Sequence, residues 1–355
     1  MIVVQSGEDI AENARNAPDG AIIVVAPGIY SAVVLNPGDV QGSLTIFADV
    51  TGEFTNSAPA AVTIVAKSSD VAAFEGFSQS GLSIDGFTLR GGTDAGFLCG
   101  DCSGITVQDC IVTGSGGDAV RLERSDDVLV FNNLLNGNKG GGVTAFGTTN
   151  LQIINNTIYN NATDGILLSL DENQHASTNA FLRNNIITKN KQTGIVVDAG
   201  PPTSLDGFDA DFNLNTNGYD GTARAANDVT LDPLFIFPTG GDFHLAAPSS
   251  PALDRGTDAI DGSLVSELEQ LTTQTDGSLD TLPLDLGYHY LAPIPTPTKV
   301  PKPTRTGTPR ATATRTGGAP GATPTPTHTG AITAPTPTPA GKPTRTRAPT
   351  STPRH

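Results

Sequence analysis

The chain lacks any run of 18 or more apolar residues, so it contains no segment able to cross a membrane as a helix. A signal peptide is also missing, because Met1 directly precedes what reads as a capping strand. The rest of the sequence is typical of exported proteins. We therefore expect an extracellular or cell-surface protein whose export signal is missing from this sequence, with a cytosolic protein as the alternative.

Positive charge is scarce before residue 291. Residues 1–290 hold all 36 acidic residues but only 11 of the 20 basic ones, which gives this part a net charge of −25. Such acidity argues against nucleic acid and anionic membranes as partners of the folded part. It also repels polyuronates unless divalent cations bridge the two chains. No cofactor is firmly predicted, and calcium is the one we keep open.

Acidic residues are absent from the last 65 residues, which hold 15 of the 26 prolines, 19 threonines and a net charge of +9. Such a segment cannot bury enough apolar surface to fold. The sequence therefore predicts a disordered, basic, Pro/Thr-rich tail over residues 291–355. The tail is suited to touching acidic wall polymers or folding back on its own acidic domain.

A block of residues repeats every 23 positions, and once after 29. Three apolar columns result, each with one residue per repeat: Ile84, Val107, Val130, Ile153 and Leu182; Leu89, Val112, Leu135, Ile158 and Ile187; and Phe97, Val120, Val143, Ile166 and Ile195. Between the first two columns lie the pairs Asn132-Asn133, Asn155-Asn156 and Asn184-Asn185. A fixed period of this length means one structural unit per repeat, stacked on its neighbours.

The order of residues within a repeat predicts three short strands separated by bends. Each repeat reads apolar-x-apolar-x-Asn-Asn-x-apolar, then a polar turn, then Gly-apolar-x-apolar. Leucine-rich repeats need a different spacing with a single Asn. At a tight bend Asn tolerates the left-handed conformation, and stacked Asn amides can bond one another along the axis.

These features resemble the right-handed parallel β-helix of the pectate-lyase-like superfamily over roughly residues 2–205, and the Asn pairs match its asparagine ladder. Open ends of such a stack need caps. The run Ser6-Gly7-Glu8-Asp9 predicts a hydroxyl N-cap for a capping helix over Ile10–Ala17, followed by a strand over Ala21–Val25.

The period breaks between Leu231 and Tyr290. Phrases there, including Asp285-Leu286-Gly287-Tyr288, resemble the C-terminal module that closes the last coil in many bacterial surface β-helix proteins. We therefore expect an all-β chain with the β-helix at 1–205, the last coils and closing module at 206–290, and the disordered tail at 291–355.

Three cysteines, Cys99, Cys102 and Cys110, lie within twelve residues. Cys110 occupies the ladder column, and Cys99 falls on the inward side of its strand. One disulfide between neighbours would leave an odd thiol. A zinc site would need a fourth ligand, and no His is near in sequence. We therefore expect small buried residues that fill the coil.

The resemblance implies that substrate lies along the Gly-apolar-x-apolar strands. Alternation directs one row of residues there to solvent. The candidate binding residues are Glu123, Thr144, Phe146, Ser169 and Asp198, with Lys189 and Lys191 in the turn of the last regular coil. Phe146 offers a stacking face for a sugar.

Asp118 and Asp164 are the candidate catalytic carboxylates, with Arg121 beside Asp118. They lie two coils apart in register, which separates their backbones by about 9.6 Å, and inverting glycosidases hold their carboxyls roughly 6.5–9.5 Å apart. An ordinary role in turns is the alternative. The polygalacturonase, pectate-lyase and epimerase signature phrases of the superfamily are absent.

Two further segments attract attention. The 29-residue repeat inserts a loop around Asp171–His175, which makes His175 a candidate acid or base. The run Asp209-x-Asp211-x-Asn213-x-Asn215 imitates a calcium loop, but Leu214 stands where that loop requires Gly, so we predict a strand instead.

The sequence therefore favours a non-catalytic surface protein that binds polysaccharide, a cell-wall polymer or another surface partner along its sheet face. The alternative is a polysaccharide lyase, glycoside hydrolase or epimerase that uses a groove on the same face. The oligomeric state is not predicted.

Overall fold

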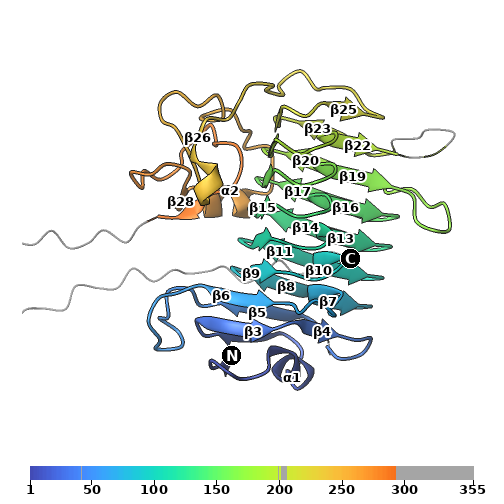
Figure 1. Cartoon of the computed structure of the whole chain (residues 1–355), viewed down its shortest axis with the longest axis vertical. Helices are drawn as coiled ribbons and strands as arrows, with labels where there is room; N and C mark the ends of the chain where they lie inside the picture. The colour runs from blue at the N-terminus through green and yellow to red at the C-terminus, as the bar shows by residue number, and fades with distance from the viewer. Residues whose placement is uncertain (41, 199, 201–205, 293–355) are drawn as a thin grey trace, which may run out of the picture. The chain divides into compact units, whose positions relative to one another are not determined.

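The computed structural model of the protein describes residues 1–40, 42–198, 200 and 206–292. The tail predicted over 291–355 lies outside the described residues from residue 293 onward. Strands β1 to β25 run parallel in three long sheets, and successive coils stack along one axis (Figure 1). This is the parallel β-helix that the repeats predicted. Two further pairs, β26–β27 and β28–β29, are antiparallel.

Each coil contributes one strand to each sheet, in the order A, B, C. Sheet A contains β1 (Ile2–Val4), β2 (Ala21–Val25), β5 (Leu44–Ala48), β8 (Leu82–Asp85), β11 (Ser103–Gln108), β14 (Asp126–Phe131), β17 (Thr149–Ile154), β20 (Phe181–Arg183) and β23 (Asp209–Asp211). Sheet B contains β3 (Gly28–Ser31), β6 (Val62–Val65), β9 (Thr88–Arg90), β12 (Ile111–Thr113), β15 (Leu134–Asn136), β18 (Thr157–Tyr159), β21 (Ile186–Thr188) and β24 (Leu214–Asn215). Sheet C contains β4 (Val33–Leu35), β7 (Ala72–Phe77), β10 (Ala95–Gly100), β13 (Asp118–Glu123), β16 (Val143–Phe146), β19 (Ile166–Ser169), β22 (Ile195–Val197) and β25 (Tyr219–Asp220).

The three predicted apolar columns are the core of the solenoid. In sheet A, for example, Val107 pairs with Ile84 and Val130. The sheet C column is in register too, with Val120 paired with Phe97 and Val143. All of these side chains are fully buried. The period-two alternation within each short strand therefore identified the inward residues correctly.

The two members of each asparagine pair have different roles at the bend between sheets A and B. The first member adopts the left-handed conformation, as in Asn132 (φ 50°) and Asn155 (φ 54°). The second member is fully buried and forms the ladder. Asn156 accepts from the backbone N–H of Asn133 at 2.9 Å and donates from its amide to the Oδ1 of Asn185 at 3.1 Å. The predicted ladder is thereby confirmed.

A second asparagine ladder, which the sequence analysis missed, follows the bend between sheets B and C. Its rungs are Ser115, Asn138, Asn161, Asn190 and Asn217, and each asparagine side chain accepts from the backbone N–H of the rung before it. The amides of Asn138 and Asn161 also donate to the next rung at 3.0 Å. The signal was present, because the rungs up to Asn190 recur with the same 23- and 29-residue spacing, and Asn217 follows after 27.

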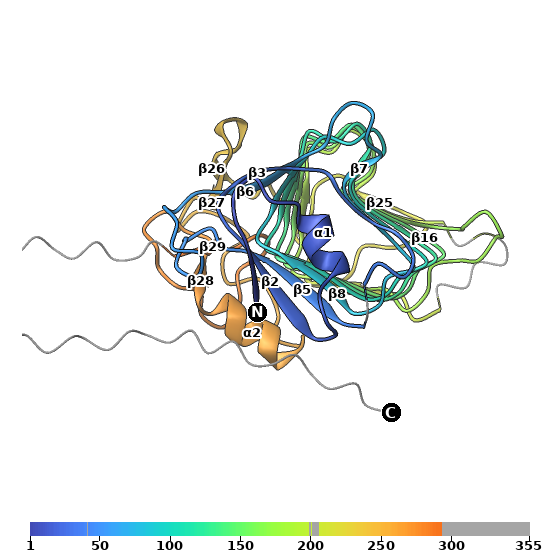
Figure 2. The same cartoon turned by 90° about the horizontal axis from the view of Figure 1, so that it is seen from below.

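A short helix lies across the N-terminal end of the stack (Figure 2). It is α1 (Ile10–Arg15), shorter than the predicted Ile10–Ala17. Its N-cap is Asp9 and not the predicted hydroxyl residue, because the Asp9 carboxylate accepts from the backbone N–H groups of Ala11 and Glu12. Ile10, Ala11 and Ala14 are buried against the first coil.

The C-terminal segment contains β26 (Phe235–Phe237), the 3₁₀ turn η1 (Pro238–Gly240), β27 (Asp242–Leu245), α2 (Gly262–Leu268), β28 (Leu271–Thr272) and β29 (Tyr290–Leu291). It lies beside the coils, on the side of the bend between sheets A and B (Figure 1). The left-handed asparagines explain this position, because their amides point outward. Asn132, Asn155 and Asn184 donate to backbone carbonyls of His289, Asp285 and Thr257.

We call the ladder at the bend between sheets A and B, with Asn133, Asn156, Asn185 and Asn213 as rungs, the inner ladder. Its last rung is capped by a different residue type. Asn213 has no further asparagine above it, and its backbone N–H donates instead to the carboxylate of Asp228 at 2.8 Å. The same carboxylate accepts from Tyr219 and from the Ala225 N–H. The chain over 225–230 thus supplies the acceptor that another coil would have provided.

Candidate functional site

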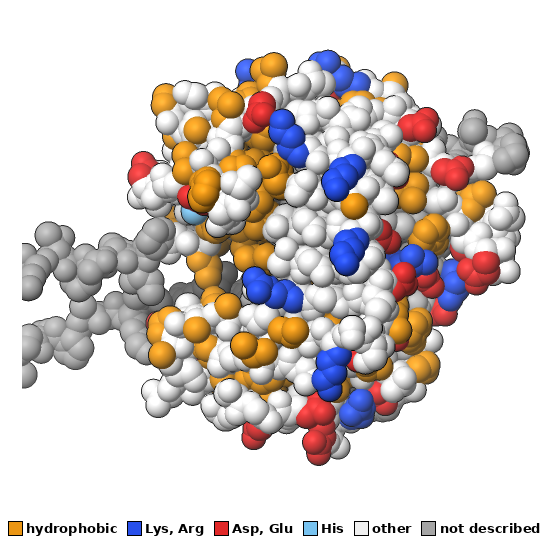
Figure 3. Space-filling view, viewed as in Figure 1, with side chains coloured by type: hydrophobic (Ala, Val, Ile, Leu, Met, Phe, Trp, Pro, Cys, Tyr) orange, Lys and Arg blue, Asp and Glu red, His pale blue; other side chains and the backbone are white. Residues whose placement is uncertain are grey.

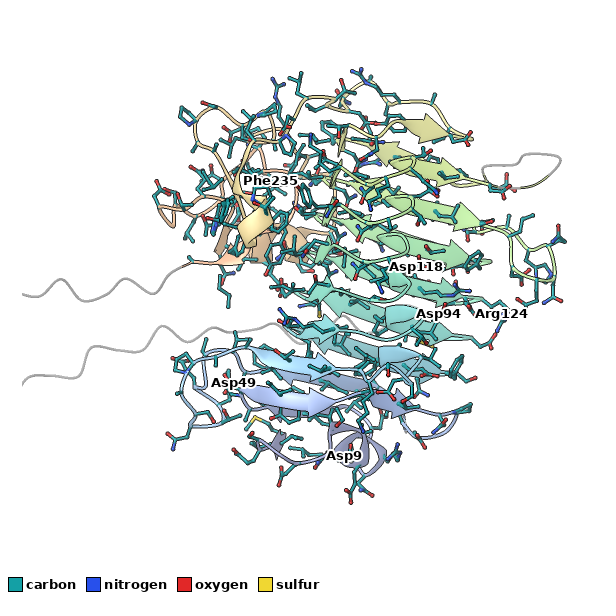
Figure 4. The ribbon with its side chains drawn as sticks, viewed as in Figure 1. Asp9, Asp49, Asp94, Asp118, Arg124 and Phe235 are labelled. Carbon is teal, nitrogen blue, oxygen red and sulfur yellow. A yellow bond between two sulfur atoms is a disulfide. The ribbon has the colours of Figure 1, made fainter. Side chains whose placement is uncertain are left out.

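The predicted substrate face is the outer surface of sheet C, where β10, β13, β16 and β19 lie side by side (Figure 4). Arg121 stands between Leu98 and Thr144, and Glu123 between Gly100 and Phe146. The structure therefore brings the predicted outward residues into the expected rows. What each side chain does there differs from one position to the next.

Asp118 and Asp164 play the same structural role two coils apart. The Asp118 carboxylate accepts from the backbone N–H of Gly141 at 2.6 Å, and the Asp164 carboxylate accepts from the N–H of Thr193 at 2.8 Å. Each side chain thus bonds the turn of the following coil. Burial raises the pKa of Asp118, although the Gly141 hydrogen bond opposes the rise.

Arg121 is surrounded by carboxylates of its own chain. Its guanidinium lies 2.7 Å from Glu123, 3.6 Å from Asp94 and 3.8 Å from Asp118. It also lies over the ring of Phe146, 4.9 Å from the ring centre. The stacking face predicted on Phe146 is therefore covered on one side by Arg121.

Two positions on the outer face of sheet C are buried, including the predicted binding residue Thr144. Thr144 is 4% exposed, and its hydroxyl supports the Asp118 carboxylate. Leu98 is also 4% exposed, because it packs with Ala72, Ala95 and Phe77 across the outer face of the sheet. Large neighbours on one face of a sheet cover each other, which alternation alone does not reveal.

Ser169 and Asp198 meet on neighbouring coils, with the serine hydroxyl 3.4 Å from the Asp198 carboxylate. Lys189 and Lys191 lie elsewhere, after β21 in the turn between sheets B and C. Lys189 is 3.5 Å from Asp232 in the C-terminal segment. These two lysines are therefore not on the outer face of sheet C.

The loop after β19 positions His175 with an acidic partner. His175 Nδ1 lies 3.0 Å from the Asp171 carboxylate, whose side chain is 1% exposed, whereas the His175 side chain is 73% exposed. Burial acts to raise the pKa of Asp171, but hydrogen bonds from His175 outweigh it and the pKa is lowered. The pair leaves the other ring nitrogen available to solvent.

Arg124 anchors this loop, which the sequence analysis did not foresee. Its guanidinium contacts both carboxylate oxygens of Asp101 at 2.8 and 3.0 Å, and both oxygens of Glu172 at 2.9 and 3.0 Å. Asp101 and Arg124 are one period apart, so their contact was readable from the repeat. The contact with Glu172 depends on the path of an irregular loop, which no periodicity encodes.

The segment that imitates a calcium loop forms a strand, as predicted. Asp209 and Asp211 belong to β23, and Asn213 is a rung of the ladder. Asp209 is paired with Arg183, and Asp211 accepts from Asn227. These oxygens are engaged within the chain and do not fit a calcium ion. Within the described ranges no cluster of three or more His, Cys, Asp or Glu could hold a metal.

The cysteines separate into a pair and a single thiol. Cys99 and Cys102 form a disulfide, the alternative that leaves an odd thiol, and all three side chains are buried in the core as expected. Cys110 is buried and free, and its backbone N–H donates to the ladder residue Asn133, as its column predicted. Burial raises the pKa of its thiol well above the usual value.

Two depressions of the described surface lie away from the outer face of sheet C. One, of about 300 Å³, is lined by Lys67, Lys139 and glycines of the turns between sheets B and C. The other, of about 200 Å³, lies between Gly7–Ile10 and Ile29–Ala32, beside α1. The candidate carboxylates thus do not line either depression.

Comparison with known proteins supports the fold. Residues 73–230 match the family model described as "Right handed beta helix region". No curated protein matches the sequence. Among solved structures, the periplasmic alginate epimerase AlgG aligns with 64% of this chain and 81% of that chain, at 14% identity and a TM-score of 0.30. A likeness this small carries no argument about fold or activity, so the support for the fold comes from the family model.

In the part of the chain that the structure describes, no helix is long and apolar enough to cross a membrane. Three parallel sheets with matching columns, two ladders and the matched family region all lead to one assignment. The chain is a right-handed parallel β-helix protein, the fold that its resemblance to the pectate-lyase-like superfamily implied.

Proposed function

We propose that this is an exported or cell-surface protein that binds polysaccharide along the outer face of sheet C without altering it chemically. One observation carries the proposal: the groups required for chemistry are engaged within the fold. Asp118 and Asp164 accept from backbone amides of the next coil, and Arg121 is held by three carboxylates. A catalytic pair needs a free acid and a free base within reach of the scissile bond.

The face retains the features of a contact surface. Phe77, Phe146, Leu167 and Val196 are partly exposed along it. Rings and aliphatic side chains suit the apolar faces of sugar rings. Burial, and then the nearby charge of Asp70, raise the pKa of Glu75 on the same face. Because the carboxylates on this face are engaged within the protein, we expect the face to prefer uncharged sugar chains to polyuronates.

Export is supported by the disulfide between Cys99 and Cys102. Disulfides persist in oxidising compartments and are rare in the cytosol. The acidic folded part and the Pro/Thr-rich composition of the tail agree with a surface role.

A second function has one specific observation in its favour. The Asp171–His175 pair has the arrangement of an oriented acid or base, with a buried carboxylate on one ring nitrogen and the other exposed. A lyase, hydrolase or epimerase that uses His175 would act at the loop and not at the predicted carboxylates.

An activity and binding screen of the full chain tests both functions. The panel contains neutral and acidic polysaccharides with and without calcium, and the readouts are new reducing ends, unsaturated uronate absorbance and proton exchange. We expect no product but retention on a neutral polysaccharide, weakened about fivefold to tenfold by Phe146→Ala. The matched control, Phe237→Ala, removes an exposed ring far from sheet C.

Product release or proton exchange would overturn the non-catalytic proposal. Loss of that activity in His175→Ala would establish the loop as its site, and loss in Asp118→Asn or Asp164→Asn would establish the carboxylates. Equal retention of the parent and Phe146→Ala would remove sheet C as the binding face.

A further inference from the structure

The corner between sheets B and C concentrates the positive charge of an acidic domain. Five of the 11 basic residues before residue 291 lie at this corner, all exposed, and we call them the basic corner: Lys67, Arg90, Lys139, Lys189 and Lys191. They end or follow β6, β9, β15 and β21, all strands of sheet B. Figure 3 shows basic side chains arranged in a line down this face.

The solenoid sets the spacing of these charges. Lys139 and Lys191 occupy equivalent positions, because their backbone N–H groups donate to Ser115 and Asn161, rungs of the same ladder. They are two coils apart, or about 9.6 Å along the axis, and the corner spans five coil rises from Lys67 to Lys191, or about 24 Å. The charges therefore form a line that matches an extended polymer better than a compact ion.

Most of these cations have no acidic partner within the described ranges. Lys67, Arg90, Lys139 and Lys191 form no ion pair there, and Lys189 is 3.5 Å from Asp232. The Asp70 carboxylate accepts from the Lys67 backbone N–H, not from its ammonium group. On sheet C, by contrast, Arg121 and Arg124 are each neutralised by carboxylates. Cations without partners are free to meet an anion from outside.

The chain also leaves room between these cations. The depression of about 300 Å³ lies here, with Lys67 and Lys139 at its edges and Gly91, Gly92, Gly114 and Gly116 among its lining residues. A Cβ built on Gly114 would meet nothing within 4 Å. A side chain at Gly114 would thus occupy the open space, so glycine lets a ligand approach the backbone.

We propose that the basic corner binds a linear phosphate-bearing polymer that runs along the solenoid axis. Four of the five cations are lysines, which bind phosphate as point charges and need no fixed bidentate geometry. The site goes beyond the proposed function, because it is a different face with the opposite charge.

Binding of long-chain inorganic polyphosphate to the full chain tests the proposal, with the dissociation constant measured at several salt concentrations. The double variant Lys67→Gln/Lys139→Gln should bind about tenfold more weakly at low salt, with a shallower salt dependence. The control Arg224→Gln/Arg255→Gln removes the same charge elsewhere and should bind like the parent.

A second pair of variants separates the site from overall charge. Gly114 has φ +70°, a conformation that Asn and Asp both tolerate. Gly114→Asp should weaken polyphosphate binding severalfold more than Gly114→Asn, because only Asp places a negative charge in the depression. Unchanged binding in the lysine double variant would assign the affinity to the basic tail and overturn the proposal.

Two further outcomes are decisive. Equal or tighter binding of polygalacturonate, lost in the same variants, would overturn the phosphate assignment in favour of a carboxylate polymer. Phe146→Ala should leave polyphosphate binding unchanged, so failure of the sheet C proposal and failure of this one are distinguishable.

Discussion

The inner ladder predicts a large loss of stability when one buried amide is removed. Asn156 is fully buried, accepts from the backbone N–H and the side-chain amide of Asn133, and donates to carbonyls of Val130 and Ile154 and to Asn185. In Asn156→Ala the backbone N–H of Asn133 loses its acceptor inside the coil, which costs about 1–3 kcal/mol. The cavity adds to this, so the free energy of unfolding should fall by about 2–4 kcal/mol.

Thermal unfolding of the full chain, followed by far-ultraviolet circular dichroism, measures this loss. For a domain of this size each kcal/mol lowers Tm by about 2 °C, so we expect a decrease of about 4–8 °C. The control is Asn173→Ala at an exposed loop position, which should change stability by less than about 0.5 kcal/mol. A loss below about 1 kcal/mol in Asn156→Ala would refute the view that the ladder stabilises the stack.

Three other predictions follow from the described contacts. Because burial raises the folded-state pKa of Asp118 above 3.8, its contribution to stability is full at low pH and is lost as pH rises through that raised pKa. The Tm of Asp118→Asn relative to that of the parent should therefore increase as the pH is raised from 3 to 8. Thiol titration should label no cysteine in the native protein, Cys110 alone after denaturation, and Cys99 and Cys102 only after reduction. Arg124→Ala should speed proteolysis within residues 170–177 while lowering stability by less than about 1 kcal/mol.

The fold was predictable because its information is periodic. The columns through Val107, Val112 and Val120 each repeat a local pattern, and stacking copies that pattern along the axis. The end of the chain was less predictable. The segment after Leu231 is held against the coils by the outward amides of Asn132, Asn155 and Asn184. These contacts join residues 73 to 157 positions apart, so the repeat pattern does not predict them.

The candidate site was predictable in position but not in chemistry. Register placed Asp118 and Arg121 on one face correctly. Whether a carboxylate is free to react depends on individual hydrogen bonds, which the sequence pattern does not reveal. One example is the 2.6 Å bond from the backbone N–H of Gly141 to the Asp118 carboxylate. The same holds for Phe146, whose ring is covered by Arg121 from the neighbouring strand.

The inner ladder also shows which part of each repeat is constrained and which part can vary in length. Its successive rungs are 23, 29 and 28 residues apart, yet the bonds between them stay at 2.9–3.1 Å. Much of the extra sequence in the longer repeats extends from the stack at one edge, between sheets C and A, and it includes the loop that holds His175. New segments can therefore be exchanged along that edge while the core remains the same, which makes it the natural place to graft foreign loops onto this scaffold.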